Sequence, residues 1–289
     1  MAAGAAALAA IGVLLGGALL GLAQEAAREW DSAAAAFDLY LLRVARFTLW
    51  QAALSTLLSV APAVLVARAL AKHPRFFGRG FILQLFAVPL ALPAIVAALG
   101  VLALYGRAGY FAPVFTALAG ERWQGIYGLP GILVAHVFFN LPLAARLLLA
   151  ALETVPADQW RLSAQLGMGP LASFRFIEWP VLRAALPGVA GLVFMLCATS
   201  FTIVLTLGGG PRATTLEVAI YQALRFDFDP ARAIVLMLVQ VALTGTVVAV
   251  LSRIGASMTG DASLPVSPRR ALFPGRGETG LNEIGRAHV

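Results

Sequence analysis

The chain has 289 residues, of which 60% are hydrophobic and 12% are charged, and its net charge is +7. Soluble domains carry roughly twice that charged fraction, so the composition excludes an ordinary soluble domain and indicates an integral membrane protein. The one cysteine, Cys197, lies in an apolar run and cannot form an intrachain disulfide. Because His, Cys, Asp and Glu form no cluster with metal-ligand spacing, no metal site is expected.

Six apolar runs are long enough to cross about 30 Å of hydrocarbon as helices, which takes about 20 residues each. They lie near residues 4–23, 47–71, 80–104, 130–151, 184–207 and 231–252. We therefore predict an all-α integral membrane fold with six transmembrane helices in residues 1–253. The first run could instead be a cleaved signal peptide, but it lacks the basic amino-terminal region of such peptides, which favours a retained helix.

Residues 254–289 are rich in Gly, Ser, Pro and Arg and have no periodicity, which is typical of a flexible linker. Within this tail, residues 283–289 back-translate to a common sequencing-adapter sequence. We therefore expect that the reading frame runs past the end of a sequenced fragment there.

The distribution of basic residues predicts the orientation. With a cytoplasmic amino terminus, 13 of the 21 Lys and Arg residues fall in cytoplasmic segments, among them the short basic loop 72–80. The positive-inside rule therefore places both termini in the cytoplasm. Since topology explains the basic excess, no nucleic-acid partner is expected.

The outer loops have two recognisable patterns. Residues 105–129 mix tyrosine and tryptophan with glycine, as expected at a membrane interface. In residues 208–230, three glycines and Pro211 should end the fifth span, and Thr214 with Glu217 matches a capping box. An apolar stripe at helical spacing follows, which predicts an amphipathic helix lying flat outside. The stripe consists of Leu216, Ala219, Ile220, Ala223 and Leu224.

Residues 152–183 form the longest polar interruption between two apolar runs. Pro156 suits a first helical position, and Leu162 and Leu166 then lie one turn apart. Gly167 and Gly169 permit the left-handed backbone that ends such a helix.

Beyond the glycines, Pro170 should start a second short helix, and Pro180 and Pro187 should break it before the fifth span. Two short helices that present aromatic and aliphatic side chains suit helix-in-groove recognition by a soluble partner. The alternative is an interfacial helix without a partner.

Gly167, Ile177 and Pro180 have the spacing found in the cytoplasmic loop of binding-protein-dependent ABC importer permeases, which this segment resembles. The family loop begins with Glu-Ala-Ala, where this chain has Arg161, Leu162 and Ser163. The run SAQLGMGPLASFRFIEWPVL is similar more narrowly to thiamine-importer permeases. So are the runs FMLCATSF, LTLGGGPRATTLEVAIYQAL and DFDPARA.

The resemblance implies a type I ABC importer permease in the bacterial inner membrane. It implies three partners: a cytosolic ABC ATPase dimer, a periplasmic solute-binding protein and a second permease half, so that this chain corresponds to the amino-terminal half of a longer transporter. The implied ATPase-coupling residues are Pro156, Trp160, Arg161, Leu162, Ser163, Leu166, Gly167, Ile177 and Pro180. The implied binding-protein docking residues are Gly209, Gly210, Pro211, Thr214, Thr215 and Glu217.

The sequence contains no G-x-x-x-x-G-K-[ST] pattern, so the chain is not expected to hydrolyse ATP. ATP and Mg²⁺ are expected on the partner ATPase, and no cofactor is expected in this chain.

Polar side chains inside apolar runs often mark a solute path or helix contacts. The candidate solute-path residues are His136, Asn140, Thr199, Ser200 and Thr202, and Gln51, Gln84 and Gln240 are further candidates. Hydrogen bonding between helices is the alternative for each of them. No charged residue is expected in the middle of a span.

The resemblance implies import of thiamine or its phosphates. An iron(III) or other small-solute ABC permease is the nearest alternative. A secondary transporter is the alternative from another class, although such proteins usually need intramembrane ionisable residues.

Overall fold

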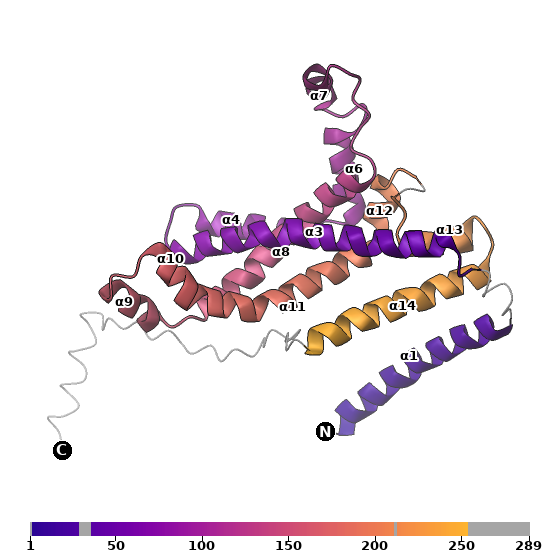
Figure 1. Cartoon of the computed structure of the whole chain (residues 1–289), viewed down its shortest axis with the longest axis horizontal. Coiled ribbons are helices and arrows are strands. Elements are labelled where there is room, and N and C mark those ends of the chain that lie inside the picture. Colours follow the sequence, from indigo (N-terminus) through magenta and orange to yellow (C-terminus); the bar gives the residue numbers. More distant parts are fainter. Residues whose placement is uncertain (1, 29–35, 211–212, 254–289) are drawn as a thin grey trace, which may run out of the picture. The chain divides into compact units, whose positions relative to one another are not determined.

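A computed structural model describes residues 2–28, 36–210 and 213–253 (Figure 1). Within these ranges all regular elements are helices, as the composition predicts. The long helices are α1 (Ala2–Arg28), α3 (Leu39–Lys72), α8 (Leu129–Glu153), α11 (Trp179–Ala198) and α14 (Pro230–Arg253). The shorter ones are α4 (Arg79–Leu85), α5 (Val88–Ala91), α6 (Ala94–Tyr105), α7 (Ala112–Ala119), α9 (Ala157–Gln165), α10 (Pro170–Ser173), the π turn η1 (Phe174–Glu178), α12 (Phe201–Leu207) and α13 (Leu216–Arg225). The predicted linker 254–289 lies outside the described residues.

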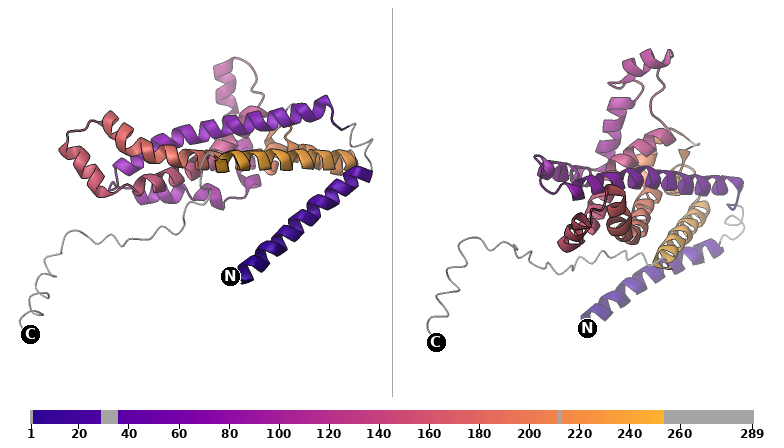
Figure 2. Two further views of the ribbon diagram at one scale, coloured as in Figure 1. Left: turned by 60° about the horizontal axis from the view of Figure 1, so that its bottom comes forward. Right: turned by 60° about the vertical axis from the view of Figure 1, so that its left-hand side comes forward.

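Helices α3, α8 and α11 pack side by side at the centre of the described bundle (Figures 1 and 2). Small side chains lie where they meet: Ala52, Ala63, Ala67, Ala144 and Ala145 have no exposed surface. Small residues let helix backbones approach closely, which favours helix association in lipid. The alanines of α3 and α8 therefore let these two helices pack closely.

Four described helices are long and apolar enough to cross a membrane, by length and composition alone. They are Leu39–Lys72, Leu129–Glu153, Pro170–Ala198 and Pro230–Leu251. The bent pair Arg79–Ala91 and Ala94–Tyr105 would make a fifth. The first predicted span, 4–23, falls within helix α1.

The predicted span 80–104 is not one continuous helix. Helices α5 and α6 are separated by a break at which the chain bends by 106°. Pro93 stands directly before α6 with ψ 136°, and Leu92 is likewise extended. The residue before a proline is pushed away from helical backbone angles, so Pro93 ends one helix and starts the next.

The expected break at Pro180 and Pro187 is wrong, because the helix runs without interruption from Pro170 to Ala198. Trp179 N–H bonds to the carbonyl of Phe174, five residues back, as in a π turn. This wider turn displaces the carbonyls that a proline ring would otherwise meet. The interruption comes instead at Thr199, where α11 ends before α12 begins, inside the predicted span 184–207.

The amphipathic stripe after the outer loop forms α13, as predicted, but most of it packs against protein. Leu216, Ala219 and Ala223 are buried in a cluster with Val44 of α3 and Leu236 of α14. Helix α13 therefore covers the amino-terminal ends of α3 and α14 rather than lying free on the surface.

The predicted capping box of Thr214 and Glu217 is wrong. Thr215, not Thr214, is the residue before α13, and it makes no side-chain cap bond. Instead, the Leu216 N–H donates to Thr48 Oγ1 of α3 at 3.0 Å. A tertiary contact has replaced the local cap.

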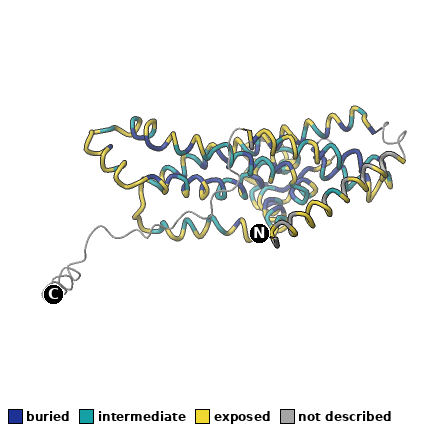
Figure 3. Tube along the Cα trace, turned by 90° about the horizontal axis from the view of Figure 1, so that it is seen from below, coloured by how far each residue is buried: buried dark blue, intermediate teal, exposed yellow. Residues whose placement is uncertain are grey.

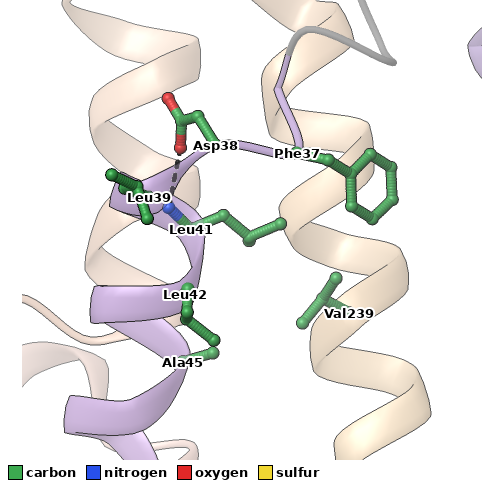
Figure 4. Close-up of a pocket in the computed structure, with 7 residues that line it drawn as sticks. All are labelled: Phe37, Asp38, Leu39, Leu41, Leu42, Ala45 and Val239. Atoms are coloured by element: carbon green, nitrogen blue, oxygen red, sulfur yellow. Dashed lines mark hydrogen bonds between the residues drawn. The ribbon is translucent and has the colours of Figure 1, made fainter.

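Asp38 caps the amino-terminal end of α3 and links it to α14. Its Oδ1 accepts the Leu41 N–H at 2.8 Å and caps the helix (Figure 4). Its Oδ2 pairs with Arg232 of α14. An open groove of about 590 Å³ beside it is lined by Leu42 and Val239 among other apolar side chains.

Candidate functional site

The docking segment, residues 154–178, carries the predicted ATPase-coupling residues except Pro180, which lies two residues beyond it. Helix α9 lies at the end of the described bundle (Figure 1), and of its residues only Ser163 is buried. The burial trace shows the same end mostly exposed (Figure 3). Pro156 is the capping residue just before α9 rather than its first helical residue, and Asp158 lies in the first turn. An acidic side chain there stabilises the positive end of the helix dipole.

The prediction of a left-handed backbone at Gly167 and Gly169 is confirmed for Gly167 alone. Gly167 has φ +65° and ends α9, whereas Gly169 has φ −67° and extended backbone. The Gly167 N–H bonds to Ala164 O at 3.1 Å, and the Met168 N–H bonds to Ser163 O at 3.0 Å. This pair of bonds is a Schellman turn, which a left-handed glycine makes possible.

Several large apolar side chains of this segment face away from the described bundle. Leu162 is 55% exposed and Leu166 is 68% exposed, one turn apart on α9. Leu171 and Phe176 are 79% and 67% exposed on the second helix. Exposed apolar side chains of this kind mark a protein–protein or a membrane contact.

The remaining predicted coupling residues divide between surface and interior. Trp160 is half-buried, while Arg161 is exposed and lies 3.3 Å from Asp158 (Nη1 to Oδ1). An exposed pair at this spacing stabilises a helix only slightly. Ile177 is 9% exposed and packs inward, whereas Pro180 is exposed.

Sequence reasoning missed Glu178, which is 1% exposed at the end of η1. Its Oε2 accepts a hydrogen bond from Arg68 Nε, and its Oε1 lies 3.4 Å from Lys72 Nζ. The Arg68 guanidinium also lies 4.0 Å from the ring centroid of Phe174. We call Arg68, Lys72 and Glu178 the inner ion-pair cluster. No local signal reveals it, because Glu178 lies 110 residues from Arg68 in the sequence.

A buried polar cluster lies between α3, α8 and α11. Ser55 Oγ and His136 Nδ1 are 2.9 Å apart, and Gln51 Nε2 donates to Cys197 O at 2.9 Å. Asn140 Nδ2 lies 3.3 Å from Cys197 Sγ. His136 and Asn140 are thus placed as interhelical hydrogen-bonding groups, the alternative to a solute path.

The structure does not join the other candidate solute-path residues to this cluster. Thr199 is exposed, and its hydroxyl donates to Met195 O at 2.9 Å. Ser200 and Thr202 are half-buried around the break between α11 and α12. A largely apolar groove of about 730 Å³ lies between α3, α11 and α14, and none of the five candidates lines it.

The predicted binding-protein docking residues are only partly on the surface. Gly209 and Gly210 are exposed, with φ of +68° and +134°. Thr214 and Thr215 are 4% and 0% exposed, so their side chains cannot meet a partner in this conformation. Glu217 is half-buried, and burial raises its pKa above the ordinary value.

Besides its positive φ, Gly209 has a second reason to be glycine, which is close contact with the neighbouring loop. Gly209 lies so close to the neighbouring loop that a Cβ would be 3.0 Å from Tyr127 Cβ. The Gly128 N–H bonds to Leu207 O at 2.8 Å in the same contact. Pro211 lies outside the described residues.

Comparison with solved structures identifies the class of fold. The chain superposes on a bacterial ABC transporter involved in the import of the acidic polysaccharide alginate with a TM-score of 0.73 and 14% identity. The match covers 88% of this chain and 93% of that chain. An inward-facing structure of the MetNI methionine ABC transporter gives 0.58 and 18%, over 76% and 96% of the two chains. The fold is therefore the one found in these two ABC transporter chains.

Sequence relatives are more specific. The chain is 58% identical over 282 residues to the thiamine transport system permease protein ThiP of Brucella abortus (strain 2308), across 98% of this chain and 52% of that protein. It is 57% identical over 203 residues to ThiP of Escherichia coli (strain K12), across 70% of this chain and 38% of that protein. The expected resemblance is confirmed. The chain spans about half the length of the Brucella relative, and no protein-family model matches it.

Proposed function

We propose that the chain is part of the membrane-spanning permease subunit of an ATP-driven importer that moves thiamine or its phosphates into the cytoplasm. The observation that carries this proposal is the 58% identity to a thiamine permease along nearly the whole chain. The exposed leucines of α9 support it, because they offer an apolar helix face where a coupling helix is expected.

The proposed assembly has three protein partners. A cytosolic ABC ATPase dimer receives α9 and supplies the ATP and Mg²⁺ chemistry. A periplasmic solute-binding protein docks on the outer loops near residues 105–129 and 208–229. A second permease half completes the pathway. The proposed setting is the bacterial inner membrane, with six spans and both termini in the cytoplasm.

An iron(III) or other small-solute importer is the nearest alternative within the same class. A secondary transporter is the alternative from another class. Such carriers usually place ionisable residues within their spans for ion coupling, and none is expected in the middle of a span here.

The test uses proteoliposomes that contain the full-length transporter with its ATPase, and the binding protein is added outside. Radiolabelled thiamine uptake is measured with ATP and with a non-hydrolysable analogue inside. ATP-dependent uptake of thiamine is expected. Uptake without hydrolysis would refute the ABC assignment, and ATP-driven uptake of iron(III) alone would refute the substrate.

A further inference from the structure

The inner ion-pair cluster joins the docking segment to helix α3. Glu178 closes the π turn, and its carboxylate meets Arg68 and Lys72 in the last two turns of α3. Phe174 at the start of the same turn lies under the Arg68 guanidinium. Helix α3 therefore holds both ends of the π turn that leads out to α9.

The ion pair near the other end of the docking segment is more exposed. Arg79 Nη2 lies 2.7 Å from Glu153 Oε1 at the end of α8, with 47% of the Glu153 side chain exposed. An exposed ion pair contributes little and rearranges easily. The Glu178 side chain is only 2% exposed, although its partners Arg68 and Lys72 are 23% and 34% exposed, and removing one partner of a largely buried pair is unfavourable. The stronger ion-pair contact of the segment is thus the one at Glu178.

Between Lys72 and its amino-terminal end, α3 also contacts the buried polar cluster and the start of α13. Ser55 and Gln51 hold the buried polar cluster through His136 and Cys197. Thr48 accepts the N–H that starts α13, at the outer loop. The helix is about 36 Å long between Lys72 and Thr48, from a rise of 1.5 Å per residue. One continuous helix therefore contacts all three regions through side-chain bonds.

We propose that Glu178 is the positioning residue that makes the docking segment and α3 move as one body. A displacement of α9 by a partner then moves α3, and with it the polar cluster and the start of α13. The proposal rests on the proposed function only for the identity of that partner as an ATPase.

The test compares Glu178→Gln with Glu153→Gln, which makes the same change in the exposed pair. Spin labels on Gln159 of α9 and Leu65 of α3, both exposed, report the distance between segment and helix in the full-length transporter bound to its ATPase. Wild type and Glu153→Gln should give one narrow distance that ATP leaves unchanged. Glu178→Gln should give a broad distribution, and uptake per ATP hydrolysed should fall at least tenfold while ATPase co-purification is retained.

Three outcomes would overturn the proposal. The first is a narrow, unchanged distance in Glu178→Gln, and the second is wild-type uptake per ATP in that variant. The third is loss of co-purification, because Glu178 would then serve the docking surface itself. If Glu178→Gln does not insert, the double variant Arg68→Gln/Glu178→Gln carries the same test, because it leaves no unpaired charge in that pair.

A wrong assignment of the substrate or of the ATPase partner can be distinguished from a wrong role for Glu178. If the wild-type transporter binds the ATPase but imports no thiamine, the substrate assignment fails, while the label distances still test Glu178. If no ATPase binds, the distance in the transporter alone still separates Glu178→Gln from the Glu153→Gln control.

Discussion

Gly167 and Gly169 lie two residues apart in the docking segment, yet only Gly167 needs to be glycine. Neither would bring a Cβ within 4 Å of another atom, so space does not distinguish them. The difference is the positive φ of Gly167, which costs other residues about 1–2 kcal/mol.

Gly167→Ala should therefore loosen the end of α9 by about 1 kcal/mol, and Gly169→Ala should be nearly neutral. Hydrogen–deuterium exchange of the amides in residues 157–168 measures this directly. Faster exchange is expected in Gly167→Ala alone. Equal exchange in the two variants would contradict the assignment of the left-handed position.

Glu217 gives a prediction on pH. Burial raises its pKa in the folded protein, so the folded state favours the protonated carboxyl. The stability contributed by this group is present below the unfolded-state pKa and is lost as the pH rises through the folded-state pKa.

Glu217→Gln should therefore raise the melting temperature slightly at pH 7, and the gain should shrink as the medium is acidified through the carboxyl pKa. Thermal unfolding in detergent at several pH values measures it, with wild type as the reference at each pH. A difference that does not vary with pH would argue against burial as the cause.

The role of a single residue could be predicted when it depended on its neighbours in the sequence. Gly167 could be identified because a glycine after an amphipathic turn is a common helix end. Glu178 could not, because its burial depends on Arg68, 110 residues away. Thr214 was misread for a similar reason: Thr48 of α3 takes the role that a local cap would have had.

At the scale of elements, α9 presents one apolar edge. Leu162 and Leu166 are exposed along it, whereas Ala164, also exposed, lies on the opposite side of the helix. An ATPase groove that buries these leucines would gain about 1.5–3 kcal/mol for each.

Leu162→Asp and Leu166→Asp should each weaken binding to the ATPase by about 10- to 100-fold. Ala164→Asp is the matched control and should bind nearly as wild type does. Titration of the detergent-purified transporter with labelled ATPase measures the dissociation constants. If Ala164→Asp weakens binding as much as the leucine variants, the docking face lies elsewhere.

The elements that the sequence predicted best are those with regular apolar periodicity, such as α8 and α13. Prolines were harder to interpret. Pro93 breaks its helix, whereas Pro180 and Pro187 do not, because Pro180 follows a π turn and Pro187 lies within a helix packed on both sides. A sequence shows where a proline lies but not whether neighbouring helices compensate for its missing N–H.

At the scale of the whole molecule, the proposed orientation can be tested with single cysteines. The native Cys197 has no exposed surface and should not react. Phe77 is fully exposed, as is most of Leu162, and both are expected on the cytoplasmic side. Tyr110 and Phe228 are each 79% exposed and are expected outside.

Cysteine at Tyr110 or Phe228 should react with a membrane-impermeant maleimide in intact spheroplasts, and cysteine at Phe77 or Leu162 should react only after lysis. The unaltered protein is the background control. Labelling of Phe77→Cys in intact spheroplasts would reverse the proposed orientation.

The π turn of η1 contains one residue more than an α-helical turn requires. Deleting an exposed residue there, such as Arg175, would let the turn close as a regular α-helical one. The wide turn already takes up the extra residue, so the helix before it should keep nearly the same rotational phase, whereas the same deletion in a regular helix would turn it by about 100°. Phe174 should therefore stay beside Arg68, and α9 should keep its side of the bundle. A deletion variant whose Gln159–Leu65 label distance departs from wild type would argue against this.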